Sequence, residues 1–298
     1  MSISSFYETV LFQDAAFPLK ISHVELAAQG RELSTGEVLP HWHEHMEFHW
    51  FEKGGSKVLT GSEWITVEDG DVTMVNPSEL HTLLPGECPS SYWFFIISPQ
   101  LLGGDDADAY GRFWKSLATQ QTRFQHLIRH DPLVIQLIAA MVAEYQAMEP
   151  GYELAIRGHL FQLMARLYRA HRQPLPTAPS RKRQDQRLKE VLQHIGEQYA
   201  QPLSPQSLAD SCGLNLSYFC RLFRQGTGMT AAAYITAYRL SKAEELLTST
   251  DLSVTDIAAR VGFSDMAYFS RRFKRQYGLS PLQFRQQTVE KPPITTGG

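Results

Sequence analysis

Histidines recur at alternate positions in one short stretch of the N-terminal half. Residues 41–49 read HWHEHMEFH, so that four histidines and Glu47 occupy every second position. Successive side chains of a β-strand point to opposite faces, which predicts that these five side chains share one face. Imidazole nitrogens and a carboxylate suit zinc, nickel, manganese or iron, and the same groups can instead line a polar pocket and hydrogen-bond a ligand. The stretch therefore predicts a binding site for a metal ion or a polar molecule.

A second set of chemistry-bearing residues lies in a duplicated segment near the C-terminus. The segment that starts at Leu208 recurs about 50 residues later, and one residue is inserted in the turn of the second copy. Two copies are too few for a solenoid, so this is a duplicated motif. The matching pairs are Leu208 and Ile257, Gly213 and Gly262, Phe219 and Phe269, Phe223 and Phe273, and Gly228 and Gly278.

Each copy has the pattern of a helix-turn-helix. Ser204 followed by proline, and Ser253 three residues before Asp256, are helix-entry signals. They predict first helices over 205–212 and 254–261 and, after a glycine, second helices over 217–225 and 266–276. In this motif the second helix lies in the major groove of DNA. The other interpretation is a pair of helical hairpins whose basic faces are only solvated.

The second helices each combine an apolar face with a polar, basic one. Arginine can pair with a guanine edge through two hydrogen bonds, while lysine and flanking arginines suit phosphates. A connecting helix over 231–247, roughly 25 Å long at 1.5 Å per residue, could hold the two second helices about one DNA turn, ~34 Å, apart. The candidate DNA-binding residues are Ser217, Cys220, Arg221, Arg224, Ala267, Ser270, Arg271, Lys274 and Arg275.

The composition supports a division of the chain into two parts with different functions, and it excludes several classes of protein. Residues 1–180 carry 12 Lys and Arg against 21 Asp and Glu, whereas residues 181–298 carry 16 against 10, so the net charges are −9 and +6. A basic C-terminal part suits a polyanion. The longest apolar stretch, residues 133–143, is too short for a membrane span of ~20 residues. Three cysteines without CxxC spacing and no signal-peptide pattern predict a cytoplasmic protein.

The chain predicts an α+β multidomain protein. Short strands with regular turns over 1–105 favour a β-barrel or sandwich, and 106–172 is a helical extension that serves either to pack on this domain or to dimerise. Residues 173–186 are rich in proline, serine and charge and are predicted to be a linker, 187–290 an all-α DNA-binding domain, and 291–298 a flexible tail.

The duplicated motif resembles a known family. Residues 254–285, VTDIAARVGFSDMAYFSRRFKRQYGLSPLQFR, strongly resemble the second helix-turn-helix of AraC/XylS-type transcription regulators, and residues 208–240 resemble the first. In that family a base-contacting arginine stands two residues before a phenylalanine, which implies this role for Arg221 and Arg271. The resemblance implies neighbouring contacts from Ser217, Cys220, Ala267 and Ser270. Cysteine and alanine hydrogen-bond poorly, so these two could instead touch a thymine methyl group.

The histidine stretch resembles the metal set of a cupin β-barrel. The spacing HxHx3E with a later histidine implies His41, His43, Glu47 and His81 as ligands, although Gly36 lies one residue closer to His41 than is usual and the second motif lacks its glycine. AraC-type regulators commonly carry an N-terminal cupin that senses an effector and dimerises. Most such cupins bind small organic effectors, often sugars, without metal. Aromatic faces pack on sugars, so Trp50 and Trp93 are added to the candidate effector-binding residues.

These observations together predict an effector-controlled transcription regulator. We expect an activator of a carbohydrate-utilisation operon that binds promoter half-sites of double-stranded DNA as a homodimer and contacts RNA polymerase, with no membrane role. A weaker similarity to the melibiose-type branch of sugar-operon regulators, seen in HWH, SLATQQ and residues 232–247, suggests an α-galactoside as effector. No cofactor is required, but a divalent metal in the cupin is possible. The alternatives are a metal-responsive regulator and a cupin metalloenzyme; GxGxxG, GxxxxGK[ST] and GxSxG are absent from the sequence, and no enzyme is expected.

Overall fold

The chain folds into two compact units. The computed structural model describes residues 10–28, 39–61, 63–102, 109–119, 121–173 and 179–290. The N-terminal unit contains the described residues from 10 to 28 and from 41 to 181, and the C-terminal unit contains residues 39–40 and 182–290. Among these residues no helix is both long and apolar enough to cross a membrane.

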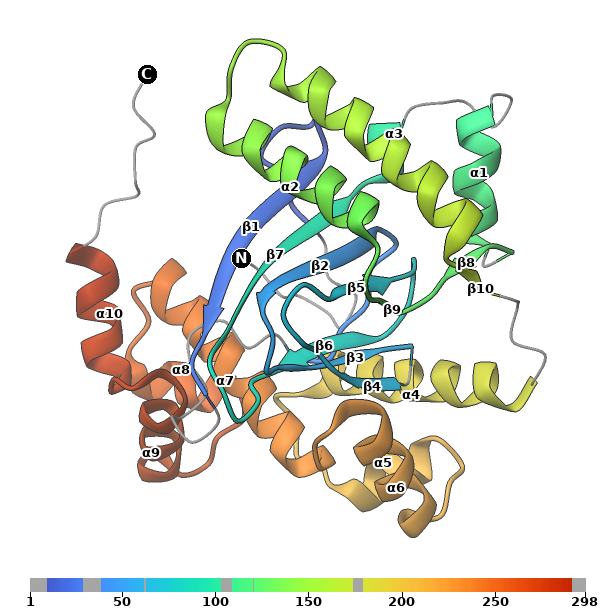
Figure 1. The fold of residues 1–298 in the computed structure, drawn as a ribbon. Coiled ribbons are helices and arrows are strands. Elements are labelled where there is room, and N and C mark those ends of the chain that lie inside the picture. The colour runs from blue at the N-terminus through green and yellow to red at the C-terminus, as the bar shows by residue number, and fades with distance from the viewer. Residues whose placement is uncertain are drawn as a thin grey trace. The chain divides into compact units, whose positions relative to one another are not determined.

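Two main antiparallel sheets form the N-terminal unit (Figure 1), and β8 pairs with β10 in a separate two-stranded sheet. The larger sheet has the strand order β1-β7-β2-β5-β9, and the smaller one has the order β4-β3-β6. The β-rich N-terminal half is therefore confirmed, while β8, β9 and β10 are short strands beyond residue 105, where the sequence predicted a helical extension and a linker. The bounds are β1 (Leu19–Leu26), β2 (Met46–Lys53), β3 (Lys57–Thr60), β4 (Glu63–Thr66), β5 (Val72–Val75), β6 (His81–Leu84), β7 (Ser90–Ile97), β8 (Arg123–Phe124), β9 (Leu127–Ile128) and β10 (Arg172–Gln173).

Strand β2 is central to the larger sheet and is buried on both faces. Phe48 lies opposite Phe95 of β7 and Met74 of β5, and all three belong to the main apolar core. Glu47 and His49 alternate with Phe48 and therefore face the other way. Phe51, on the same face as Glu47, packs in a second core with residues of the smaller sheet. The polar residues of β2 thus face the smaller sheet.

The helices of this unit cover the apolar face of the larger sheet. They are the 3-10 helix η1 (Pro99–Leu102), α1 (Ala109–Ala118), α2 (Pro132–Ala147) and α3 (Tyr152–Ala170), and Figure 1 shows α2 and α3 as an antiparallel pair beside the sheet. Leu137 and Met141 of α2, and Leu160 and Leu167 of α3, are buried in the main core. These apolar stripes are buried within their own unit, which supports packing rather than dimerisation as their role.

The C-terminal unit is helical throughout the described residues. Helix α4 (Pro179–Gln198) begins inside the predicted linker, so the expectation of an exposed linker over 173–186 is wrong from residue 179 onward. Residues 174–178 of that linker and the predicted tail 291–298 lie outside the described residues. The other helices are α5 (Pro205–Ser211), α6 (Leu216–Thr227), α7 (Ala231–Ser249), α8 (Val254–Arg260), α9 (Met266–Tyr277) and α10 (Pro281–Glu290).

The duplicated motif is structurally equivalent in its two copies. Gly213 and Gly262 both have positive φ, 63° and 90°, in the turns that follow the first helices. Phe219 and Phe269 are fully buried at equivalent places. The turn from Gly262 to the next helix is one residue longer than the turn from Gly213, as the sequence offset predicts. Both copies are therefore helix-turn-helix motifs.

Candidate functional site

Helix α6 is the second helix of the first motif, and its sequence explains where it begins and ends. Asn215 caps the N-terminus, its side chain accepting a hydrogen bond from the Tyr218 amide at 2.8 Å. Gly228 ends the helix in the left-handed conformation. Phe219 and Phe223 are buried, which fixes the rotation of the helix. All four predicted DNA-binding residues of this copy are therefore exposed: Ser217, Cys220, Arg221 and Arg224.

Helix α9 repeats this arrangement in the second motif. Asp265 caps it by accepting from the Tyr268 amide at 2.9 Å, and this hydrogen bond, together with nearby Arg271, holds the pKa of Asp265 below its ordinary value. Phe269 and Phe273 are buried against α7 and α8. Of the predicted contacts, Ser270 is half-buried. The other four are exposed: Ala267, Arg271, Lys274 and Arg275.

The two helices thus present basic side chains at equivalent places. Arg221 and Arg271 each stand one helical turn before a second cation, Arg224 and Lys274 respectively, on the exposed face. The Arg221 guanidinium lies over the Tyr218 ring, 5.5 Å from its centroid. An exposed row of this kind can reach base edges and phosphates together.

The histidine stretch forms a cluster with a residue from a different strand. His41, His43, Glu47 and His81 are all buried, and one donor atom from each lies within 4.8 Å of the others. The ring centroids of His41 and His81 are 4.1 Å apart, and those of His43 and His81 are 4.9 Å apart. The four residues that the resemblance to cupins implies are therefore brought together. We call them the histidine cluster.

The backbone places these residues differently from the predicted continuous strand. β2 begins only at Met46, and the chain leaves the extended conformation between His43 and His45. His41 instead pairs with His81 through two backbone hydrogen bonds, 2.9 and 3.1 Å long. The expectation that one strand carries the whole stretch is therefore wrong, and His45 is not among the four clustered donors.

Backbone carbonyl groups fix the orientation of two of the histidine rings. His43 Nδ1 lies 3.2 Å from the His45 carbonyl oxygen, and His81 Nδ1 lies 2.9 Å from the Glu79 carbonyl oxygen. A carbonyl oxygen only accepts hydrogen bonds, so both Nδ1 atoms donate a proton. The Nε2 atoms face Glu47 Oε2, at 2.8 Å from His43 and 3.3 Å from His81.

Glu47 is a buried carboxylate held by three imidazoles. Its second oxygen, Oε1, lies 2.8 Å from His49 Nε2, while His49 Nδ1 contacts the Thr73 hydroxyl at 3.0 Å. Burial raises the pKa of Glu47, but the adjacent His81 and hydrogen bonds from His43, His49 and His81 outweigh this effect. The pKa of Glu47 consequently lies well below its ordinary value, and the carboxylate is ionised.

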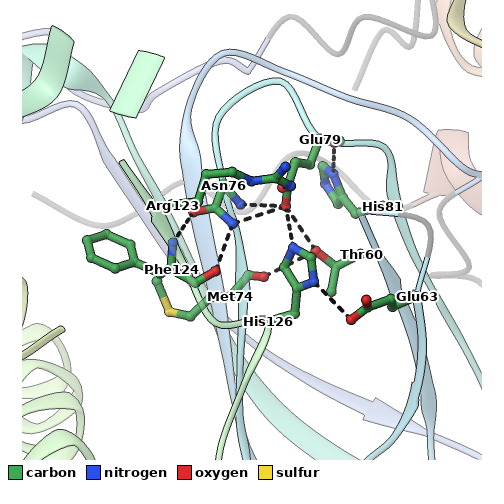
Figure 2. A network of polar contacts seen from close by, with 9 residues as sticks. All are labelled: Thr60, Glu63, Met74, Asn76, Glu79, His81, Arg123, Phe124 and His126. Carbon is green, nitrogen blue, oxygen red and sulfur yellow. Dashed lines mark hydrogen bonds and ion pairs between the residues drawn. The ribbon is translucent and has the colours of Figure 1, made fainter. Parts of the chain in front are cut away.

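A polar network around Glu79 supports the segment that carries His81 (Figure 2). The Glu79 carboxylate accepts hydrogen bonds from the Asn76 amide at 3.1 Å and from His126 Nε2 at 3.0 Å, and it pairs with Arg123. Its own carbonyl oxygen accepts from His81 Nδ1. No local sequence pattern singles out the members of this network, because they come from separate segments of the chain: Asn76, Glu79, Arg123 and His126.

The two tryptophans do not lie with the histidine cluster. Trp50 and Trp93 are direct cross-strand partners and pack with the main core on the helix-covered face of the sheet, opposite to Glu47. Trp93 Nε1 donates to Glu52 at 3.2 Å on that face. The expectation that these side chains help to line the same pocket as the histidines is therefore corrected. Trp50 stands three residues after Glu47, and the period of a strand puts it on the other face.

Each of the two units matches a known protein family. Residues 31–164 match the AraC-like ligand binding domain, and residues 208–287 match a helix-turn-helix domain. The chain belongs to the AraC family of DNA-binding transcription regulators and combines a ligand-binding domain with a helix-turn-helix domain.

Two relatives match the chain along most of its length. The chain is 30% identical over 290 residues to the HTH-type transcriptional activator RhaS of Enterobacter sp. (strain 638), which covers 93% of this chain and 97% of the relative. It is 29% identical over 292 residues to RhaS of Klebsiella pneumoniae (strain 342), again over 93% and 97%. Among solved structures it is similar to ToxT from Vibrio cholerae O395, with 11% identity, 92% and 99% coverage and a TM-score of 0.43.

Proposed function

We propose that this protein is a cytoplasmic transcriptional activator of a carbohydrate-utilisation operon, switched by a sugar that binds its N-terminal domain. The observation that carries the proposal is the similarity along nearly the whole chain to proteins named as HTH-type transcriptional activators, joined to a basic row on each second helix. The protein acts as a homodimer on promoter half-sites and contacts RNA polymerase.

Two neighbouring cations of α9 have different roles in the proposed DNA binding. Arg271 reads a base edge, and Lys274, one turn further on, contacts phosphate; both are exposed. Arg271→Ala is expected to cost ~1–3 kcal/mol on the specific site and to relax selectivity, while Lys274→Ala weakens binding to all sequences alike and reduces the salt slope by about one. Fluorescence anisotropy with operator and scrambled duplexes over a salt series separates the two. Arg271→Ala binding both duplexes as tightly as the unchanged protein would falsify this placement of α9.

An arginine of the same unit, outside the second helices, provides the matched control. Arg260 ends α8, the first helix of the second motif, and is exposed. Arg260→Ala removes the same charge as Arg271→Ala and is expected to leave the selectivity between operator and scrambled duplex unchanged. A loss of selectivity in both variants would show that net charge, and not the position of Arg271, governs the readout.

The proposal that a sugar is the effector rests on a buried polar site in a domain of the AraC-like ligand-binding type. A sugar presents hydroxyl groups that both donate and accept hydrogen bonds, which suits imidazoles beside an ionised carboxylate. The melibiose-type similarity makes an α-galactoside the first candidate. A panel of sugars that includes melibiose is to be tested for a shift in the thermal midpoint and for transcription from a target promoter. A panel without any sugar that acts in both assays would contradict the sugar as effector but not the DNA-binding role.

The metal-responsive regulator remains the second candidate, because the four clustered donors are those of a transition-metal site. Under this alternative the metal itself changes DNA affinity, and no sugar is needed. Operator binding in the presence of chelator or added metal, without sugar, distinguishes the two.

A further inference from the structure

We propose that the histidine cluster is a metal centre in which His41, His43, Glu47 and His81 bind one divalent transition-metal ion, such as Zn²⁺. The four donors are buried, mutually within 4.8 Å, and come from two segments that the backbone pairing of His41 with His81 joins. This inference goes beyond the proposed function and does not depend on which molecule is the effector.

The Nε2 atoms of His43 and His81 face the same carboxylate oxygen. Since the Nδ1 atoms of His43 and His81 donate to carbonyl oxygens, a neutral ring at either place has a lone pair on Nε2. Both lone pairs then face Glu47 Oε2, which also accepts only. His81 Nε2, on a ring that is nearly fully buried, lies 3.3 Å from Glu47 Oε2 and has no other hydrogen-bond partner among the described residues. Something positive is required between these three atoms.

Protons can fill this role only by making cations of both rings. Two buried imidazolium rings would then lie 4.9 Å apart, with the His41 ring 4.1 Å from one of them, beside a single carboxylate. Two imidazolium rings at this distance repel each other, because like charges disfavour the charged form of both groups. One divalent ion instead takes the lone pairs of neutral imidazoles and the carboxylate oxygen together. The ion therefore satisfies all four groups at once.

The groups behind the four ligands also hold them as in a metal site. A metal-binding imidazole usually donates its other N–H to a carbonyl or carboxylate, which fixes the ring and raises its basicity. His43 and His81 both do so, and the carbonyl that holds His81 belongs to Glu79, which the network of Figure 2 supports. His49 holds Glu47 Oε1 at 2.8 Å and leaves Oε2 directed at the two Nε2 atoms.

The spacing of the donor atoms is near that around a bound ion. Metal–nitrogen bonds of about 2.1 Å separate neighbouring ligand atoms by about 3.0–3.4 Å and opposite ones by about 4.2 Å. The donor atoms of the cluster lie within 4.8 Å of one another, so the ligands have to draw together only slightly to bind one ion. Where the proposed function places a sugar at this site, its hydroxyl oxygens meet the ion; this consequence rests on the proposed function, whereas the metal centre does not.

The test is metal content and ligand identity on the full chain. Untagged protein purified without chelator, and chelator-treated protein reloaded with Zn²⁺, are measured by inductively coupled plasma mass spectrometry. About one ion per chain is expected, falling at least tenfold in His43→Gln and in His81→Gln. The matched control is His23→Gln. His23 also pairs with a glutamate, Glu52, at 2.9 Å, but it is partly exposed and outside the cluster. The control is expected to keep the ion.

X-ray absorption spectroscopy identifies the ligand atoms of Zn²⁺ in the unsubstituted protein. Its result therefore does not depend on whether any variant folds. Imidazole scattering with nitrogen or oxygen ligands at about 2.0–2.1 Å is expected. A sulfur shell, which would implicate cysteines, overturns the proposal. So does reloaded protein with less than a tenth of an ion per chain, or equal loss of metal in His23→Gln and His43→Gln.

Parallel measurement of operator binding keeps this inference separate from the proposed function. A metal-free protein that binds its operator and responds to a sugar refutes the metal centre alone. A protein with one ion per chain that selects no DNA sequence refutes the proposed function alone.

Discussion

The two turn glycines of the duplicated motif provide a matched pair of substitutions. Gly213 and Gly262 occupy equivalent positions and both have positive φ, 63° and 90°. A Cβ at Gly213 meets nothing within 4 Å, whereas a Cβ at Gly262 would lie 2.7 Å from the carbonyl oxygen of Ala200. Comparing alanine substitutions at these two positions therefore separates the free-energy cost of the left-handed backbone from the cost of the steric overlap with Ala200.

The expected magnitudes follow from these two terms. Gly213→Ala is destabilised only by the left-handed conformation, at a cost of about 1–2 kcal/mol. Gly262→Ala has the same cost and also forces backbone apart, for which overpacking data give a further cost of about 1–3 kcal/mol. With a urea slope of about 1.5 kcal/mol per molar, the midpoint falls by roughly 1 M in Gly213→Ala and by about 2 M or more in Gly262→Ala.

The assay uses two signals from the same sample. Circular dichroism at 222 nm follows the helices of both units, most of which lie in the C-terminal unit. Tryptophan fluorescence follows the N-terminal unit alone and serves as the internal control, so the part of the circular dichroism transition that does not coincide with the fluorescence transition belongs to the C-terminal unit. All five tryptophans lie in the N-terminal unit: Trp42, Trp50, Trp64, Trp93 and Trp114. Both substitutions are expected to shift the first signal and not the second. Equal shifts for the two variants, or a larger shift for Gly213→Ala, would refute the contact between Gly262 and Ala200.

Three further predictions concern the N-terminal unit. His49→Gln is expected to weaken Zn²⁺ binding about 10–100-fold, because it releases the Glu47 carboxylate; competition with a chelating dye measures this, and an unchanged affinity would remove His49 from its positioning role. Glu79→Ala is expected to cost about 3 kcal/mol of unfolding free energy, since it removes the buried carboxylate that pairs with half-buried Arg123, and Glu79→Gln to cost less; equal small losses in urea melts would contradict this. Burial raises the pKa of Asp131, but hydrogen bonds from His171 and then Arg166 leave it lowered. The ionised form therefore stabilises the fold above the unfolded pKa of about 3.9, and this stability is lost as the pH falls through the folded value, so Asp131→Asn should flatten the acid limb of stability below about pH 5.

The sequence determined the C-terminal unit to a large extent. Caps, turn glycines and the spacing of apolar residues predict α5, α6, α8 and α9 to within a residue or two of their observed bounds. These signals are local, because hydrogen bonds within a turn of helix need only near neighbours. The same periodicity fixes which face of α6 and α9 is buried. The exposed position of Arg221 and Arg271 could therefore be predicted from the sequence.

The predicted linker shows that composition alone does not distinguish an exposed linker from the start of a helix. Pro179, Ser180 and the charged residues that follow have the composition of an exposed connection, yet they begin α4. Proline is well tolerated in the first turn of a helix, so its presence there did not exclude one. The strand period likewise suffices to separate Trp50 from Glu47, whereas the aromatic character of Trp50 by itself suggested a shared pocket.

Only the tertiary structure decided how the histidine cluster is assembled. The local period suggested that His41, His43 and Glu47 act together, but the chain leaves the strand between His43 and His45, and His41 is placed by pairing with His81 instead. The orientation of His81 depends on Glu79 and thus on Arg123 and His126, from distant segments. Sequence spacing reports neighbours along a strand or a helix, whereas strand pairing and buried polar networks join residues that are far apart in the chain.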